Sequence, residues 1–425
     1  MSEGARRLRN IVGGSAGNLV EWFDWYVYAA FSVYFASAFF PEGDATAQLL
    51  NTAIVFALGF VVRPIGAWLF GVYADRRGRK AGLTLSVSLM CLGSLMIAVA
   101  PTYAQAGIVA PMVLVLARLI QGLSLGGEYG SSATYLSEMA GKERRGFWSS
   151  FQYVTLIGGQ LLALALLLVL QSELGEAGME SIGWRIAFAI GAVLAVVVFV
   201  IRRRLEETRS FESVKAAGDK PLSSGANLFR DHPREALLVM ALTAGGTLAF
   251  YAYTTYMQKY LVNTSGFDRA TASRIMTGAL FAFMLLQPLG GWLSDKVGRK
   301  PVMIAFGIAG TMFTYPLFVA LETTRDPMSA FLLVMAALVM VTGYTSINAV
   351  VKAELFPAHI RALGVALPYA IANALFGGTA EAVALYLVKI GHERWFYAYV
   401  AVVIAGSLVA YVRMKDTRDH GLIEE

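Results

Sequence analysis

Charged side chains are rare in the long apolar stretches of this chain, and the few that occur there are candidates for chemistry. Glu21 and Asp24 lie in the first stretch, and Arg118 lies in the fourth. Ionisable groups inside a bilayer are costly and usually functional. Because an arginine keeps its proton there, Arg118 requires an anionic partner. An acid that gains and loses contact with this arginine would release and bind a proton, whereas a permanent contact would be a static ion pair.

Anion binding requires cations, and Arg63, Arg118, Lys259 and Lys352 lie in apolar stretches. Arginine binds a carboxylate through two parallel N–H groups, which suits a dicarboxylate. Simpler roles exist: Arg63 could serve gating or packing, and Lys259 could extend toward the membrane surface. Lys352 could instead pair with Glu354.

Neutral polar residues in the same stretches would complete such a site. Amide and phenol groups donate hydrogen bonds to carboxylate or keto oxygens. Their alternative role is hydrogen bonding between helices. The candidate substrate-binding residues of this kind are Gln152, Tyr153, Gln160, Tyr256, Tyr369 and Asn373.

Other kinds of chemistry have little support in the sequence. The chain has one cysteine, Cys91, and four histidines scattered among loop-like segments. We therefore expect no intramolecular disulfide and no metal site. A glycine-rich phosphate-binding loop is missing, as is a nucleophile–base pair within the membrane. We expect no cofactor, no ATP-driven pump and no enzyme.

The composition predicts an all-α integral membrane protein. Of the 425 residues, 57% are hydrophobic and 15% are charged, against about 25% charged in soluble domains. The mean hydropathy is +0.58. A helix needs roughly 20 apolar residues to span a bilayer. Twelve segments qualify as spans: about 14–38, 50–73, 82–100, 108–138, 147–172, 184–202, 236–262, 271–293, 301–321, 328–355, 361–387 and 394–413.

The distribution of basic residues fixes the expected orientation in the lipid bilayer. With the N-terminus on the cytoplasmic side, 25 Lys and Arg residues fall on that side and six on the other. Basic residues favour cytoplasmic loops, so both termini are expected in the cytoplasm. The net charge of +6 is then a topology signal, and we expect no nucleic-acid partner.

A polar, basic segment divides the spans into two sets of six. It contains glycine, proline and serine, which are typical of a linker. We interpret residues 1–202 as an N-terminal six-helix half, 203–235 as a cytoplasmic linker, and 236–425 as a C-terminal six-helix half.

The two halves share a motif between their second and third spans. Residues 71–80 and 291–300 both read G-x-x-x-D-[RK]-x-G-R-K. Parallel repeats of this kind are typical of one class of secondary transporter. The glycines permit a tight turn, and the acid and the basic residues can form ion pairs that latch one conformation.

A weaker repeat relates Glu138 and Arg145 to Glu354 and Arg361, with the same spacing in both halves. We expect Glu138 to pair with Arg144 or Arg145, and Glu354 to pair with Arg361. Such pairs contribute about 1 kcal/mol or less each in water, but several together can bias a balanced equilibrium. The predicted latch comprises Gly71, Asp75, Arg76, Gly78, Arg79, Glu138, Arg145, Gly291, Asp295, Gly298, Arg299, Glu354 and Arg361.

The duplicated loop resembles the signature of the major facilitator superfamily. Segments 17–28, 63–66, 118–122 and 126–130 resemble the metabolite:proton symporter family within it. The similarity covers nearly the whole chain and is weak in the linker and the tails. It implies the major facilitator fold, with twelve transmembrane helices in two pseudo-symmetric six-helix halves that give alternating access to a midplane site.

The resemblance also implies a function. Segments 150–160, 254–264, 352–354 and 369–373 favour import of a small dicarboxylate, with α-ketoglutarate as the expected substrate, by proton symport. Other members carry citrate, shikimate or zwitterionic osmolytes such as proline betaine, and these remain alternatives. A nutrient sensor that does not transport is a further alternative on the same scaffold.

The same resemblance assigns roles to the buried charges. Sugar:proton relatives use an acid on the first span and an arginine on the fourth, and by position Asp24 and Arg118 match that pair. Glu21 is the alternative acid. The family resemblance also implies a monomer in a bacterial inner membrane.

Overall fold

The computed structural model describes residues 3–40, 45–216 and 223–423, and residues 217–222 of the predicted linker lie outside this part. The described residues form helices joined by loops. The N-terminal half contains α1 (Glu3–Phe39), α2 (Ala45–Arg77), α3 (Arg79–Ala98), α4 (Tyr103–Ala106), α5 (Val109–Met139), η1 (Lys142–Arg144), α6 (Arg145–Ser149), α7 (Phe151–Gly178), η2 (Met179–Gly183) and α8 (Trp184–Arg203).

Two short helices, α9 (Arg209–Ala216) and α10 (Gly225–Asp231), lie in the predicted linker. Ser224 caps the start of α10 by accepting a hydrogen bond from the Asn227 N–H. The C-terminal half contains α11 (Pro233–Tyr251), η3 (Ala252–Tyr256), α12 (Met257–Asn263), α13 (Arg269–Val297), α14 (Arg299–Thr323), α15 (Pro327–Thr345), α16 (Asn348–Glu354), α17 (Arg361–Ala372), η4 (Asn373–Gly377), α18 (Ala380–Lys389), α19 (Glu393–Arg413) and α20 (Thr417–His420).

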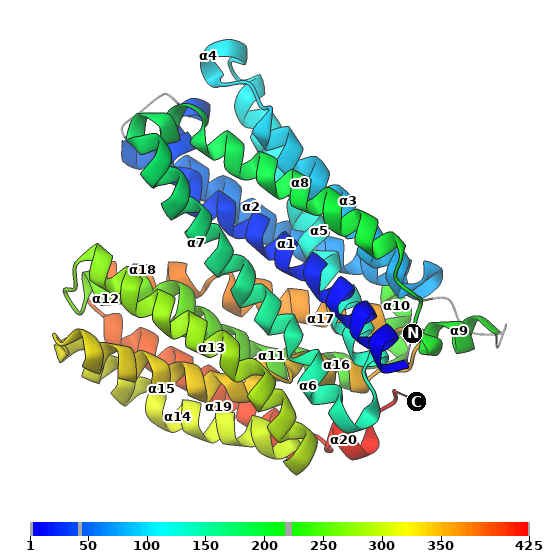
Figure 1. Ribbon diagram of the computed structural model, residues 1–425. Helices are drawn as coiled ribbons and strands as arrows, with labels where there is room; N and C mark the ends of the chain where they lie inside the picture. The colour runs from blue at the N-terminus through cyan, green and yellow to red at the C-terminus, as the bar shows by residue number, and fades with distance from the viewer. Residues whose placement is uncertain (1–2, 41–44, 217–222, 424–425) are drawn as a thin grey trace.

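Ten described stretches are long and apolar enough to cross a membrane. One of them, Lys142–Arg203, contains both α7 and α8, which run in opposite directions (Figure 1). The long helix α1 lies outside those ten stretches and packs against α7 and α8. When α7 and α8 are counted as two spans and α1 is added, the ten stretches become twelve, which coincide with the twelve predicted spans.

The two halves form two helical bundles that meet at the end carrying both termini and diverge toward the other end (Figure 1). At the closed end, α17 of the C-terminal half packs on α2 and α5. In the reciprocal arrangement, α13 packs on α6 and α7. Each half thus places its second span against the fifth span of the other half.

Two spans of the C-terminal half contain a π-helical turn, η3 in the seventh span and η4 in the eleventh. Such turns interrupt the regular α-helical hydrogen bonds and often mark functional sites. Two predicted binding residues, Tyr256 and Asn373, lie within these turns.

Candidate functional site

Asp24 lies fully buried inside the N-terminal half. Ser94 of α3 donates a hydrogen bond to its Oδ2 atom, and Gln121 of α5 donates to the same oxygen at 2.6 Å. The other oxygen, Oδ1, has no hydrogen-bond partner in the described part of the chain. A Cβ atom on Gly191 of α8 would lie 2.3 Å from Oδ1, so the glycine gives this carboxyl oxygen its space.

Arg118 contacts Asp24 through an intermediary. Its Nη1 donates to Gln121 Oε1 at 2.8 Å, and the amide nitrogen of Gln121 contacts Asp24. In the part of the chain that the structure describes, no carboxylate lies within ion-pair distance of Arg118. Gln121 therefore replaces the direct contact that we expected. The signal for it was its position three residues after Arg118, on the same face of α5.

Arg63 and Arg118 share a set of aromatic rings around Trp25. Their guanidinium carbons lie 4.2 Å and 4.1 Å from the centroid of the Trp25 ring. Arg63 also lies 3.9 Å from Phe60, and Arg118 lies 4.1 Å from Tyr28. Ring faces stabilise cations electrostatically, which explains how two buried arginines are tolerated side by side.

The same two arginines retain unused hydrogen-bond donors. The Nε and Nη2 atoms of both Arg63 and Arg118 are buried and have no acceptor among the residues that the structure describes. Buried donors are nearly always paired, so each such group calls for an explanation. Two adjacent guanidiniums with free N–H groups are suited to bind a carboxylate.

Glu21 belongs to a second buried cluster, not to the Asp24 site. Arg202 of α8 lies 3.3 Å from Glu21 and 2.5 Å from Glu128 of α5. Ser86 Oγ lies 2.8 Å from Glu21 and 2.5 Å from Glu128. Two carboxyl groups therefore share one guanidinium in a place closed to solvent. We did not select Arg202 from the sequence because it lies at a span end beside two more arginines.

Lys352 is fully buried in the C-terminal half, beneath three tyrosine rings. Its Nζ atom lies 4.1 Å from the centroid of Tyr369 and 5.1 Å from that of Tyr129. It donates hydrogen bonds to Asn348 Oδ1 at 2.9 Å and to the Tyr129 hydroxyl at 3.1 Å. The structure describes no carboxylate within ion-pair distance, so Glu354 is not its partner.

Tyr129 and Tyr369 join the two halves directly. Their rings stack with centroids 3.6 Å apart and planes 11° apart. Tyr153, another predicted residue, contacts Phe250 of the opposite half, with ring centroids 5.5 Å apart. These aromatic contacts close the space between the halves beside Lys352.

The remaining predicted binding residues are distributed more widely. Gln152 donates to Asn18 Oδ1 at 3.2 Å, which matches the alternative role of helix–helix bonding. The buried Oε1 atom of Gln160 has no hydrogen-bond partner within the described ranges. Asn373 accepts a hydrogen bond from Thr247 at 2.5 Å.

Two further predicted residues lie toward the open end of the molecule. Tyr256 donates to Glu393 at 3.2 Å. Lys259 forms an ion pair with Glu381, and its side chain is 50% exposed. The structure thus brings Asp24, Arg63 and Arg118 together and places Lys259 apart from them.

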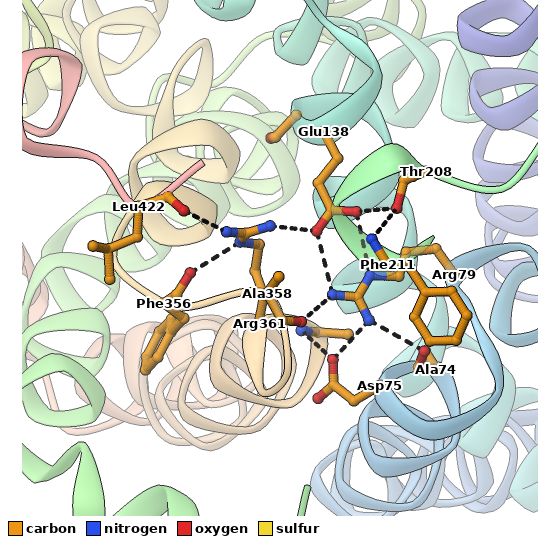
Figure 2. A network of polar contacts seen from close by, with 12 residues as sticks. Ala74, Asp75, Arg79, Glu138, Thr208, Phe211, Phe356, Ala358, Arg361 and Leu422 are labelled. Carbon is orange, nitrogen blue, oxygen red and sulfur yellow. Dashed lines mark hydrogen bonds and ion pairs between the residues drawn. The ribbon is translucent and has the colours of Figure 1, made fainter. Parts of the chain in front are cut away.

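The first copy of the repeated loop docks on the opposite half (Figure 2). Asp75 accepts hydrogen bonds from the backbone N–H groups of Ala362 and Leu363, at 3.0 Å and 3.1 Å. Arg79 contacts Asp75 at 3.0 Å and Glu138 at 3.2 Å. All these groups are buried, so the loop closes this end of the molecule with satisfied charges.

The second copy repeats the arrangement in the other direction. Asp295 accepts from the N–H groups of Gly146 and Phe147, at 2.8 Å and 2.9 Å. Arg299 contacts Asp295 at 2.7 Å and Glu354 at 3.5 Å. We refer to the two copies together, with their partner glutamates and arginines, as the latch.

The glutamate pairs of the latch cross between the halves, which corrects our expectation of pairs within each half. Glu138 lies 2.5 Å from Arg361 and Glu354 lies 3.7 Å from Arg145. A sequence repeat identifies equivalent residues but not the half that supplies the partner. The crossing follows because each fifth-span start, at α6 or α17, lies against the other half.

Glycine is required in the repeated motif for two different physical reasons. Gly78 and Gly298 have φ angles of 111° and 99°, which other residues rarely adopt. Gly71 and Gly291 allow close approach, since a Cβ atom there would lie 2.7 Å from the Leu363 backbone and 2.4 Å from the Gly146 carbonyl.

Two acids that the sequence analysis missed hold the start of each third span. Glu207 accepts from the N–H groups of Arg79 and Lys80, at 3.1 Å and 3.2 Å. Asp416 accepts from those of Arg299 and Lys300, at 3.0 Å and 3.2 Å. Burial raises the pKa of Glu207, and its backbone donors and Arg79 oppose that shift.

The residue after each of these acids is a threonine bonded to a latch glutamate. Thr208 donates to Glu138 at 2.5 Å, and Thr417 donates to Glu354 at 2.6 Å. A third internal repeat was therefore present in the sequence, as Glu-Thr-Arg at 207–209 and Asp-Thr-Arg at 416–418.

Comparison with known proteins identifies the family. Residues 10–220 and 209–424 match the family described as "Sugar (and other) transporter". The chain belongs to this family. It is 56% identical to the alpha-ketoglutarate permease of Escherichia coli strain K12, over 97% of this chain and 94% of the permease. It is 30% identical to the citrate-proton symporter of Salmonella typhi, over 94% and 93% of the two chains.

Solved structures of the major facilitator superfamily share the fold. The proton:xylose symporter XylE bound to 6-bromo-6-deoxy-D-glucose has a TM-score of 0.84, with 18% identity and coverage of 100% of this chain and 99% of that one. The partially occluded inward-open XylE from E. coli has a TM-score of 0.70 at 19% identity, over 94% and 96% of the two chains. The predicted family, the twelve-span fold and the assignment to transporters instead of enzymes are confirmed.

Proposed function

We propose that the protein imports α-ketoglutarate by proton symport. The observation that carries this proposal is the pair of buried guanidiniums of Arg63 and Arg118, with their unpaired N–H groups around Trp25. A carboxylate placed there would satisfy the free donors and compensate both charges. The 56% identity to an alpha-ketoglutarate permease supports the same class of substrate.

A second carboxylate would be bound from the C-terminal half. The Tyr369 ring lies 4.1 Å from Lys352 Nζ. A short dicarboxylate held by the two arginines would extend toward these groups. Phenol hydroxyls and the lysine ammonium are donors that suit carboxylate and keto oxygens.

The proton would be carried by Asp24, with Glu21 as the alternative. Among the described residues, the Oδ1 atom of Asp24 has no hydrogen-bond partner, and the carboxylate is connected to Arg118 through Gln121 alone. When Arg118 moves to bind an anion, the Gln121 side chain would move with it and change its hydrogen bond to Asp24. Protonation of Asp24 would in turn free Gln121 and Arg118 for the substrate, which links the two events.

The latch would stabilise the conformation closed at the end that carries the termini, and its opening would give alternating access. We propose that this end is cytoplasmic, that the membrane is a bacterial inner membrane, and that the transporter is a monomer. The basic residues that surround the latch support the orientation.

The test is uptake of labelled α-ketoglutarate into proteoliposomes that contain the purified protein. An inward proton gradient should drive accumulation, a protonophore should abolish it, and excess unlabelled α-ketoglutarate should compete. Competition by citrate, shikimate or proline betaine instead would identify one of the alternative substrates. Absence of uptake of all four by folded protein would contradict transport of this class.

A further inference from the structure

A cavity of about 800 Å³ lies at the end of the molecule that carries both termini. Its walls come from both halves: the start of α6 with η1, the end of α13, and α20 near the C-terminus. Four basic side chains line it, and all four are exposed: Lys142, Arg144, Lys296 and Arg418.

The charges of this cavity do not balance. Among its acids, Asp295 is already held by Arg299 and by two backbone N–H groups. Glu143 and Asp419 remain, so four basic groups face two free acids. Within the described chain, neither Lys142 nor Arg144 has an ion-pair partner. The cavity therefore has spare positive charge and spare donors.

The other half shows what occupies the equivalent place. Arg76 and Lys296 occupy the same position of the repeated motif. The Nε and Nη2 atoms of Arg76 donate to the Ser223 carbonyl at 3.2 Å and 2.8 Å. The Ser223 hydroxyl donates to Asp75 at 3.0 Å. The linker thus brings oxygen atoms to the first copy, whereas the described chain provides no acceptor for the Lys296 ammonium.

Two basic residues of the unfilled copy have apolar counterparts in the filled copy. In the weaker repeat that aligns Glu138 with Glu354, Lys142 corresponds to Ala358 and Arg144 corresponds to Ile360. These two positive charges are found only around the open cavity. An anionic oxygen ligand, in place of the neutral linker segment, is the ligand that this difference favours.

The position of the cavity favours a ligand at the membrane surface. Trp292 lines it and is 51% exposed. On the same helix, Leu293 and Val297 are 44% and 49% exposed. Tryptophan is enriched where hydrocarbon meets headgroups, and basic pockets between helices at that level bind anionic headgroups.

We propose that this cavity binds a phosphate group, supplied by an anionic phospholipid headgroup or by soluble phosphate. Lys142 and Arg144 from one half and Lys296 and Arg418 from the other would donate to its oxygens. The site is separate from the transported substrate, and its test does not depend on transport activity.

The experiment measures thermal unfolding of the full-length protein in nanodiscs. One arm replaces phosphatidylcholine stepwise with phosphatidylglycerol, and a second arm adds inorganic phosphate to phosphatidylcholine nanodiscs. Each basic residue near a charged surface contributes about fivefold in affinity, so Lys142→Gln with Arg144→Gln should require about twenty-five-fold more phosphatidylglycerol for the same stabilisation.

The matched control is Arg203→Gln with Arg204→Gln, which removes two exposed charges at the end of α8, outside the cavity. A response to phosphatidylglycerol that only the cavity variant loses supports a lipid headgroup. A variant-sensitive response to inorganic phosphate of equal size supports soluble phosphate. Equal responses of both double variants in both arms overturn the proposal. Unfolding of each variant in pure phosphatidylcholine checks that it is folded.

Discussion

The interiors of the two halves differ in the polar groups they bury, although the halves share one repeat. Among its described residues, the N-terminal half buries three acids and three arginines away from the latch: Glu21, Asp24, Glu128, Arg63, Arg118 and Arg202. Away from the latch, the described C-terminal spans bury a single charged side chain, Lys352, among tyrosines and amides. The repeat therefore preserves the backbone and the latch, whereas the buried charges away from the latch lie mostly in the N-terminal half.

The largest effect that this comparison predicts is at Asp24. In the Asp24→Asn variant the side chain keeps its shape but cannot bind and release a proton. We expect accumulation driven by a proton gradient to be lost, while exchange of labelled for unlabelled α-ketoglutarate across proteoliposomes continues. If the Asp24→Asn variant still accumulates substrate, Glu21 and not Asp24 carries the proton. The Glu21→Gln variant should then lose accumulation.

A large effect on stability is expected at the Glu21–Glu128–Arg202 cluster. Loss of one partner from a buried ion pair costs about 3–5 kcal/mol when it leaves a charge uncompensated. Arg202→Gln leaves two carboxyl groups without a cation, so it should lower the unfolding midpoint strongly. Glu128→Gln leaves a one-to-one pair and should lower it much less. Unfolding midpoints measured by intrinsic fluorescence in detergent test this order. A lower midpoint for Glu128→Gln than for Arg202→Gln would contradict the sharing of one guanidinium by two carboxylates.

The next largest effect is expected at the pair formed by Arg63 and Arg118. Arg118→Lys keeps the charge but removes the planar fork that reaches both Gln121 and a carboxylate. Truncating a partner in a buried charged contact costs about 2–5 kcal/mol, so uptake at low substrate concentration should fall at least thirtyfold. Arg325→Lys, at an exposed loop, is the control and should leave uptake unchanged. Equal uptake rates for the Arg118→Lys and Arg325→Lys variants would show that Arg118 does not bind the substrate.

The smallest effects should distinguish the two lysines of the C-terminal half. A hydrogen bond to a charged group contributes about 1.5–3 kcal/mol, so Lys352→Gln should weaken α-ketoglutarate binding by about tenfold or more. Lys259→Gln should change it by less than about fivefold, because exposed ion pairs contribute about 0–1 kcal/mol. Competition between labelled and unlabelled α-ketoglutarate, measured for each variant, gives the change in affinity at each lysine. A larger loss at Lys259 would place the substrate nearer the open end.

Much of the fold and part of the site follow from the sequence alone. Span positions, the repeat and the buried Asp24, Arg63, Arg118 and Lys352 were predicted because charges stand out against apolar stretches. Arg202 escaped notice because an arginine at a span end matches the positive-inside pattern, although its long side chain reaches back into the helix bundle.

The contacts that the sequence did not predict depend on packing between elements far apart in the chain. The bridge through Gln121 requires the relative rotation of α1 and α5, which periodicity does not give. Glu207 and Asp416 follow the last span of each half, yet each caps a helix that begins far earlier in the chain. Side-chain reach and helix rotation, which decide these contacts, appear only in the folded structure.

The crossed latch has a consequence for how such a protein can arise. In each direction the same motif contacts the same partners: Asp75 with Ala362 and Asp295 with Gly146, Glu138 with Arg361 and Glu354 with Arg145. This is the pattern of an isologous interface between two identical subunits. A six-helix chain that carried one copy of the motif would already be complementary to a second molecule of itself. Fusion of two such genes would preserve the closed end intact, and later changes could then concentrate the buried charges in one half.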